Sequence, residues 1–99
     1  MHIYKILTSV EASSFRASGF FVGNALDRKS GFIHMSRTLD QCSQVRSKYY
    51  KDVPDLRLLT IRTKTFPSDE LKYEGINAYP HLYAVLPYTS VIKDEEYSR

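Results

Sequence analysis

The stretch "GFIHMS", residues 31–36, places a histidine at the centre of a short apolar run and ends it on a hydroxyl. Successive side chains of a β-strand point to opposite faces. Ile33 and Met35 therefore share one face, and Phe32, His34 and Ser36 share the other. The first pair is typical of a core-facing surface. The second face presents polar groups on a rigid element, so the pattern predicts a partner or a ligand for them.

A second stretch, "PHLYAVLP" (80–87), repeats this arrangement. Strand alternation puts His81 and Tyr83 on one face, with the hydroxyl two residues beyond the imidazole and about 7 Å along the strand. A single histidine on a strand is more often a hydrogen-bonded structural residue than a catalyst. Because two histidines have matching spacing, a functional role for them is as well supported as a structural one. We expect their rings to enter one cleft.

Composition is typical of a small globular domain. The 99 residues, 42% hydrophobic and 25% charged, suit a single domain over residues 1–99. No apolar run approaches the roughly 20 residues of a membrane span, and the N-terminal residues do not resemble a signal peptide. One cysteine, Cys42, leaves no internal disulfide and suits a reducing compartment. We therefore expect a cytoplasmic protein without a membrane association.

Charge and aromatic content narrow the class of partner. The net charge of +3 is spread along the chain without a dense basic stripe, which gives no argument for a nucleic-acid partner. Eight tyrosines and five phenylalanines are many for a chain of this size. Because a small core hides phenol hydroxyls only at a cost, we expect some of these rings to line a cleft.

The order of predicted elements indicates an α+β domain with two early helices packed on a sheet. Ser9 is expected to cap a helix over 10–18, and Thr38 with Gln41 matches a capping box before a second helix over 39–50. Residues 23–31 are rich in turn formers and predict a loop. Strands are expected at 3–7, 32–36, 55–63, 70–75, 81–87 and 89–95.

Several chemistries find no support in the sequence. A zinc site needs three or four ligands at suitable spacing, and neither H-E-x-x-H nor C-x-x-C is present. Ser36 lacks a nucleophile elbow, and the four glycines form no phosphate-binding loop. Cys42 falls on the apolar face of the predicted second helix, which is typical of a buried thiol. We expect no metal site.

Five segments in order resemble the uncharacterised family catalogued as domain of unknown function 952. They are "IYKI", "GNALDRKSGFIHMSRTLDQ", "DLRLLTI", "LKYE" and "PHLYAVLP", which together extend over roughly residues 3–92. The G-F-I-H-x-S and P-H-L-Y segments are specific when both occur at this separation. This family is grouped by fold with the ADP-ribosyltransferases and is most similar to the branch that contains the RNA 2′-phosphotransferases.

The resemblance implies an ADP-ribosyltransferase-like split β-sheet with two short helices packed on it. In that branch a basic residue on the first strand and a histidine in an H-x-S-like second strand help to hold the nicotinamide dinucleotide. Carried over, these are Lys5 and then His34 with Ser36. Glu74 or His81 would supply a group at the third position. Lys5 stands where many transferases of this fold have a histidine, and the arginines of the RNA phosphotransferases have no clear counterparts.

Our leading interpretation is a pocket that binds NAD or a related nucleotide and transfers or hydrolyses its ADP-ribosyl group. A neutral imidazole would donate to a ribose hydroxyl, and a carboxylate would stabilise developing positive charge. The candidate catalytic residues are His34, Ser36, His81 and Glu74, and the candidate cofactor-binding residues are Lys5, Asp27, His34 and Tyr83. The alternative is a non-catalytic module that binds a nucleotide or another anion, and a third hypothesis is weak RNA contact through scattered basic residues.

Overall fold

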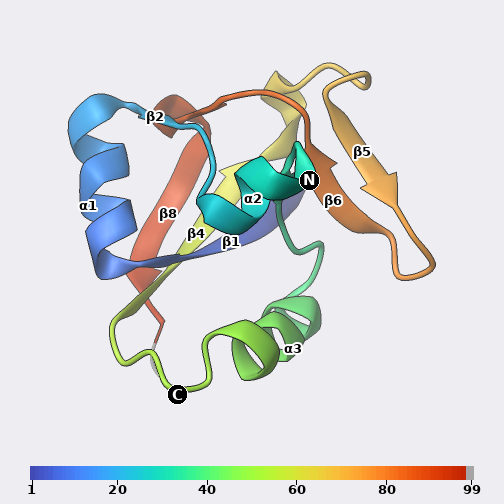
Figure 1. Ribbon diagram of the computed structural model, residues 1–99. Helices are drawn as coiled ribbons and strands as arrows, with labels where there is room; N and C mark the ends of the chain where they lie inside the picture. The colour runs from blue at the N-terminus through green and yellow to red at the C-terminus, as the bar shows by residue number, and fades with distance from the viewer. Residues whose placement is uncertain (98–99) are drawn as a thin grey trace.

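Three antiparallel sheets and three helices make up residues 1–97, the part of the chain that the computed structural model describes (Figure 1). The elements in chain order are β1 (His2–Thr8), α1 (Ser9–Ser18), β2 (Phe20–Phe21), α2 (Ala25–Ser30), β3 (Ile33–His34), α3 (Leu39–Tyr49), β4 (Leu56–Arg62), β5 (Leu71–Glu74), β6 (Tyr79–Leu82), β7 (Leu86–Pro87) and β8 (Val91–Glu96). Short 3-10 turns precede β5 and β8 at Thr63–Thr65 and Tyr88–Ser90. The architecture is the expected α+β class.

The two larger sheets are joined at one point. One sheet has the order β1-β4-β8, the second β3-β6-β5, and a small third sheet pairs β2 with β7. An isolated antiparallel bridge connects Tyr4 of β1 with Ser36, two residues beyond β3. The amide of each donates to the carbonyl of the other at 2.8 Å. This bridge fixes the end of the "GFIHMS" segment against the first strand.

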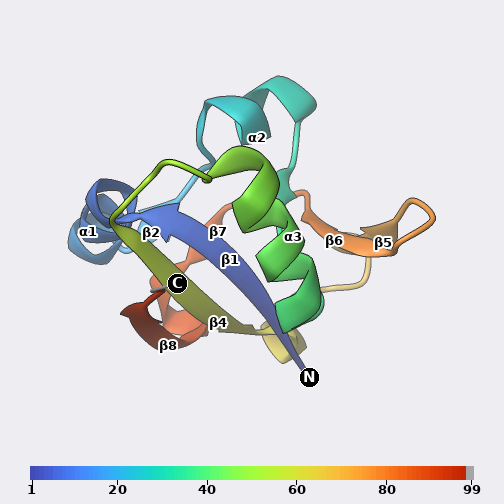
Figure 2. The same cartoon turned by 90° about the horizontal axis from the view of Figure 1, so that it is seen from below.

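The β1-β4-β8 sheet separates two hydrophobic clusters. The larger cluster contains Phe15 of α1 together with Ile33 and Met35, which are each only 3% exposed. The smaller cluster contains Cys42 of α3, and Figure 2 shows this helix lying alongside β1. The predictions that Ile33 and Met35 face the core and that Cys42 is buried are confirmed.

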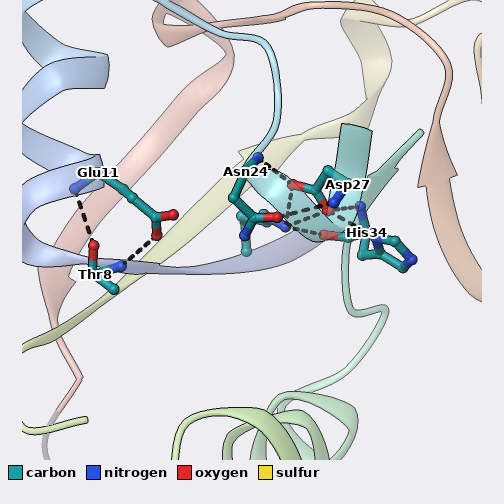
Figure 3. Close-up of polar contacts among 6 residues, drawn as sticks. Thr8, Glu11, Asn24, Asp27 and His34 are labelled. Carbon is teal, nitrogen blue, oxygen red and sulfur yellow. Dashed lines mark hydrogen bonds and ion pairs between the residues drawn. The ribbon is translucent and has the colours of Figure 1, made fainter. Parts of the chain in front are cut away.

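The helix ends follow the capping rules, with one shift in position. Thr8, not the expected Ser9, caps α1: its hydroxyl accepts from the Glu11 amide at 3.1 Å, and the Glu11 carboxylate accepts from the Thr8 amide at 2.9 Å (Figure 3). Thr38 caps α3 as predicted, accepting from the Gln41 amide at 3.1 Å. The Gln41 carboxamide instead accepts from the amide of Arg37, so the reciprocal half of the predicted box is displaced by one residue.

Three predictions about secondary structure are wrong. The expected loop over 23–31 contains the six-residue helix α2, which makes three helices within residues 1–97 where two were expected. The expected strand over 32–36 is reduced to the pair Ile33–His34 plus the bridge at Ser36. The expected strand over 81–87 is divided between β6 and β7.

No helix among the described residues is long and apolar enough to cross a membrane.

Replacement of Ile33 by alanine tests the core side of β3. Because Ile33 is buried in the larger cluster opposite Leu82, the variant should lose about 2–4 kcal/mol of unfolding free energy. Chemical denaturation followed by circular dichroism measures this loss. Val10→Ala is the control, since Val10 is 76% exposed on α1 and should change stability much less. Equal losses in the two variants would contradict the burial of the β3 face.

Candidate functional site

Helix α2 exists because two side chains satisfy its first amides. The Asn24 carboxamide accepts from the Asp27 amide at 3.0 Å, and the Asp27 carboxylate accepts from the Asn24 amide at 3.1 Å (Figure 3). This is the reciprocal geometry of a capping box. Gly31 ends the helix in the left-handed region at φ 87°. Gly23 has φ 104°, and a Cβ there would lie 2.8 Å from the Asp27 Cβ, so a glycine is required beside this carboxylate.

Asp27 is the polar centre of the site. Its side chain is 2% exposed and lies between β1 and β3. Besides the Asn24 amide, it accepts from the Lys5 ammonium at 3.2 Å and the His34 amide at 3.0 Å, and it contacts Nδ1 of His34 at 2.7 Å. Burial alone would raise the pKa of Asp27, but the Lys5 charge and the hydrogen bonds from His34 and Asn24 hold it below its ordinary value.

Lys5 is committed to internal contacts. It lies on the face of β1 that carries Ile3 and Leu7, and it is only 5% exposed. Its ammonium donates to both Asp27 oxygens, at 3.2 and 3.4 Å, and to the His34 carbonyl at 2.6 Å. Burial lowers the pKa of Lys5, and the Asp27 carboxylate opposes that effect. Lys5 therefore anchors the segment around His34 to the first strand.

His34 and His81 face each other across the β3–β6 ladder. They are directly paired in register, with ring centroids 5.7 Å apart and planes inclined at 68°. The Phe32 ring stacks on His81 at 4.0 Å and contacts His34 at 4.6 Å. Both histidines line the same cavity. The prediction that the two rings lie on adjacent strands and enter one cleft is confirmed.

A second carboxylate holds His81. Oε1 of Glu74 lies 2.8 Å from Nδ1 of His81 and accepts from the Tyr83 hydroxyl at 2.6 Å. The hydrogen bond from the Tyr83 hydroxyl lowers the pKa of Glu74, and the contact with His81 lowers it further. The same bond raises the pKa of Tyr83. Glu74 and Tyr83 lie behind His81 and are not part of the cavity wall.

The cavity has a volume of about 400 Å³, towards the small end of typical small-molecule sites. Its lining includes the polar residues Lys5, Asp27, His34, Ser36 and His81. Four tyrosines from β1, the end of α3 and β6 also line it, and we call them the tyrosine wall: Tyr4, Tyr49, Tyr50 and Tyr79. The prediction that tyrosine rings line a cleft is confirmed. Burial raises the pKa of Tyr50 to about 12, so its hydroxyl remains a neutral hydrogen-bonding group.

The structure brings together most of the residues that the sequence singled out. Lys5, Asp27, His34, Ser36 and His81 all line the cavity. Ser36 is 4% exposed, and its hydroxyl contacts the Cys42 thiol, whose pKa burial raises to about 11. No group of three or more potential metal ligands occurs within residues 1–97.

The sequence pattern placed Phe32 on the histidine face but did not identify it as a site residue, although its ring packs on both imidazoles. The pattern also did not identify which tyrosines form the wall. Phe32 lies on the histidine face of the "GFIHMS" pattern, which was a usable signal. Tyr49 and Tyr50 reach the cavity only because α3 packs alongside β1, and no local pattern shows this.

Comparison with known proteins places the chain in a family. Residues 6–94 match the model of a family described as protein of unknown function, DUF952. The chain belongs to this family.

Solved structures of protein CC0527 from Caulobacter crescentus have the same fold. Two crystal structures, one of a double mutant, are 31% identical to this chain with a TM-score of 0.86, and each alignment covers 97% of this chain and 85% of the other. A solution NMR structure is 32% identical with a TM-score of 0.83, covering 98% of this chain and 84% of the other. Among proteins with curated descriptions, none matches the chain.

Replacement of Asp27 by asparagine tests the centre of the network. The variant leaves the buried Lys5 ammonium without its counter-charge, so it should lose about 3–5 kcal/mol of unfolding free energy at pH 7. Because folding lowers the pKa of Asp27, its contribution is complete above the unfolded value of about 3.9 and is lost as the pH falls through the lower folded value. The difference from wild type should therefore shrink in acid.

Urea denaturation at a series of pH values measures this difference. Asp69→Asn is the control, because Asp69 is exposed in the turn before β5 and should change stability little at any pH. A pH-independent loss in Asp27→Asn would show that the carboxylate charge does not stabilise the fold.

Proposed function

We propose that this protein binds NAD or a related nucleotide in the cavity and transfers or hydrolyses its ADP-ribosyl group. The observation that carries the proposal is that four tyrosines and two histidines line one cavity. Aromatic faces suit a planar heterocycle, and stacking contributes about 1–3 kcal/mol per base. The imidazoles and the Ser36 hydroxyl suit the polar ribose. The family resemblance implies an ADP-ribosyltransferase-like split sheet, and this expectation supports the same assignment.

The chemistry requires one base and a dry, oriented site. The bond between ribose C1′ and the nicotinamide nitrogen breaks, and nicotinamide leaves with the electron pair as a neutral molecule. The oxygen of water or of an acceptor hydroxyl bonds to C1′, and its proton passes to Nε2 of His34 or His81. Asp27 and Glu74 act behind the two rings and orient them through Nδ1. Lys5 serves the site by holding Asp27 and the His34 carbonyl in place.

A specific observation also favours a non-catalytic binding module. The charges of Lys5 and Glu74, which were candidates for ligand contact and for stabilising positive charge, are engaged within the protein. In this second candidate the same cavity binds a nucleotide-like ligand without turnover.

Nicotinamide release from NAD distinguishes the two candidates. Wild type should release nicotinamide above the rate in buffer, and His34→Gln should reduce this rate by about 100-fold or more, in the range of general-base contributions. His2→Gln is the control, since His2 is exposed at the start of β1 and should keep the wild-type rate. Binding of NAD without any release would support the binding module and contradict the transferase.

Tyr79→Ala tests the tyrosine wall, whether the protein is a transferase or a binding module. Loss of the ring should weaken nucleotide binding by about 1–3 kcal/mol in calorimetry. Tyr73→Ala, on the neighbouring strand of the same hairpin and 42% exposed, should leave the affinity unchanged. Equal affinities of wild type and Tyr79→Ala would place the ligand elsewhere.

A further inference from the structure

Two histidines occupy equivalent positions at the polar edge of the cavity. They are cross-strand partners in β3 and β6, with ring centroids 5.7 Å apart. Each presents Nδ1 to a carboxylate oxygen, at 2.7 Å from Asp27 for His34 and at 2.8 Å from Glu74 for His81. The site therefore contains two imidazoles, each with a carboxylate at Nδ1.

A carboxylate at Nδ1 determines which nitrogen remains available for chemistry. The contact favours the tautomer that carries a proton on Nδ1, so Nε2 is left to exchange a proton with a ligand. Within residues 1–97, Nε2 of neither ring has a hydrogen-bonding partner. The Phe32 ring packs on both imidazoles and limits their rotation. Both rings are thus held as proton donors or acceptors facing one cavity.

Release of nicotinamide from NAD uses only one of these groups. Nicotinamide leaves as a neutral molecule and needs no proton, so a single base is sufficient and the second histidine takes no part in proton transfer. A bond whose leaving group is an alkoxide oxygen uses both, because one imidazole takes a proton from the nucleophile while the other gives one to the leaving oxygen. The second histidine thus points to a substrate with an oxygen leaving group.

The cavity limits the size and charge of that substrate. A volume of about 400 Å³ and a wall of four tyrosines suit one nucleoside with a small attached group, which is the size of one half of NAD. Asp27 neutralises the charge of Lys5. The other lysine that lines the cavity is Lys48, which is exposed. A phosphodiester carries a single negative charge, which a protonated imidazole and Lys48 can balance.

We propose that His34 and His81 act as an acid–base pair that hydrolyses the cyclic phosphodiester of a ribonucleoside 2′,3′-cyclic phosphate. The water oxygen bonds to phosphorus as its proton passes to Nε2 of one histidine. The bond from phosphorus to one ribose oxygen breaks, and that oxygen takes a proton from Nε2 of the other histidine. The product is a ribonucleoside monophosphate, and no oxidant, reductant or further reactant is consumed. The proposal rests on the proposed function only in using the same nucleotide-binding cavity.

Phosphorus NMR of the protein incubated with adenosine and cytidine 2′,3′-cyclic phosphates tests the proposal. Wild type should convert the cyclic ester to the monophosphate. His34→Gln and His81→Gln should each slow conversion by about 100- to 10,000-fold, because either deletion removes one half of the proton transfer. His2→Gln should convert at the wild-type rate, since His2 lies outside the cavity. Thermal unfolding of each variant verifies that it is folded.

Glu74→Gln separates orientation from folding. Glu74 is half-exposed behind His81, so this variant should remain folded, lower kcat and leave KM nearly unchanged. Absence of conversion by folded wild type with both nucleotides would overturn the proposal. Conversion that survives either histidine substitution would also overturn it. Nicotinamide release is a separate assay, so a negative result here leaves the ADP-ribosyl proposal to its own test.

Discussion

The buried ion pair between Lys5 and Asp27 is the constraint on which the rest of the site depends. A lysine on the core-facing side of β1 is costly unless its charge is balanced and its protons are bonded. Asp27 supplies the charge, and the His34 carbonyl accepts the remaining short hydrogen bond at 2.6 Å. The pair thereby ties three segments that are distant in sequence: the first strand, α2 and β3. The position of the His34 ring follows from it.

The second histidine depends on strand pairing more than on burial. His81 is opposite His34 because β3 and β6 are antiparallel neighbours, and Glu74 reaches His81 because β5 is the next strand in that sheet. The two carboxylates differ in environment. Asp27 is sealed from solvent and compensated by a cation, whereas the Glu74 side chain is 39% exposed and bonded to a tyrosine hydroxyl. The two imidazoles are therefore held by carboxylates in unequal surroundings.

Alternation within strands was enough to predict the histidine face. The pattern of Ile33 and Met35 against His34, and its repetition at His81, is enough to predict that both rings enter one cleft. The helix at Ala25–Ser30 could not be predicted with the same rule, because its residues favour turns and it is stabilised by side-chain caps and by the buried partner of Asp27.

Lys5 shows the same limit of sequence reasoning. Its place on the first strand was predicted, but its partner comes from residue 27 and depends on tertiary structure. The tyrosine wall likewise required the packing of α3 alongside β1. Local periodicity thus identified which residues share a face, whereas the contacts that give each residue its task arise between segments.

Asp27 and Glu74 hold His34 and His81 so that Nδ1 carries a proton and Nε2 exchanges one with the ligand. Long-range proton–nitrogen correlation NMR on the labelled protein above pH 7 measures the protonation of each ring nitrogen directly. We expect Nδ1–H in both histidines, whether the ring is neutral or carries a second proton on Nε2, with the exposed His2 showing an averaged pattern. A neutral ring in either His34 or His81 with its proton on Nε2 and none on Nδ1 would contradict this assignment.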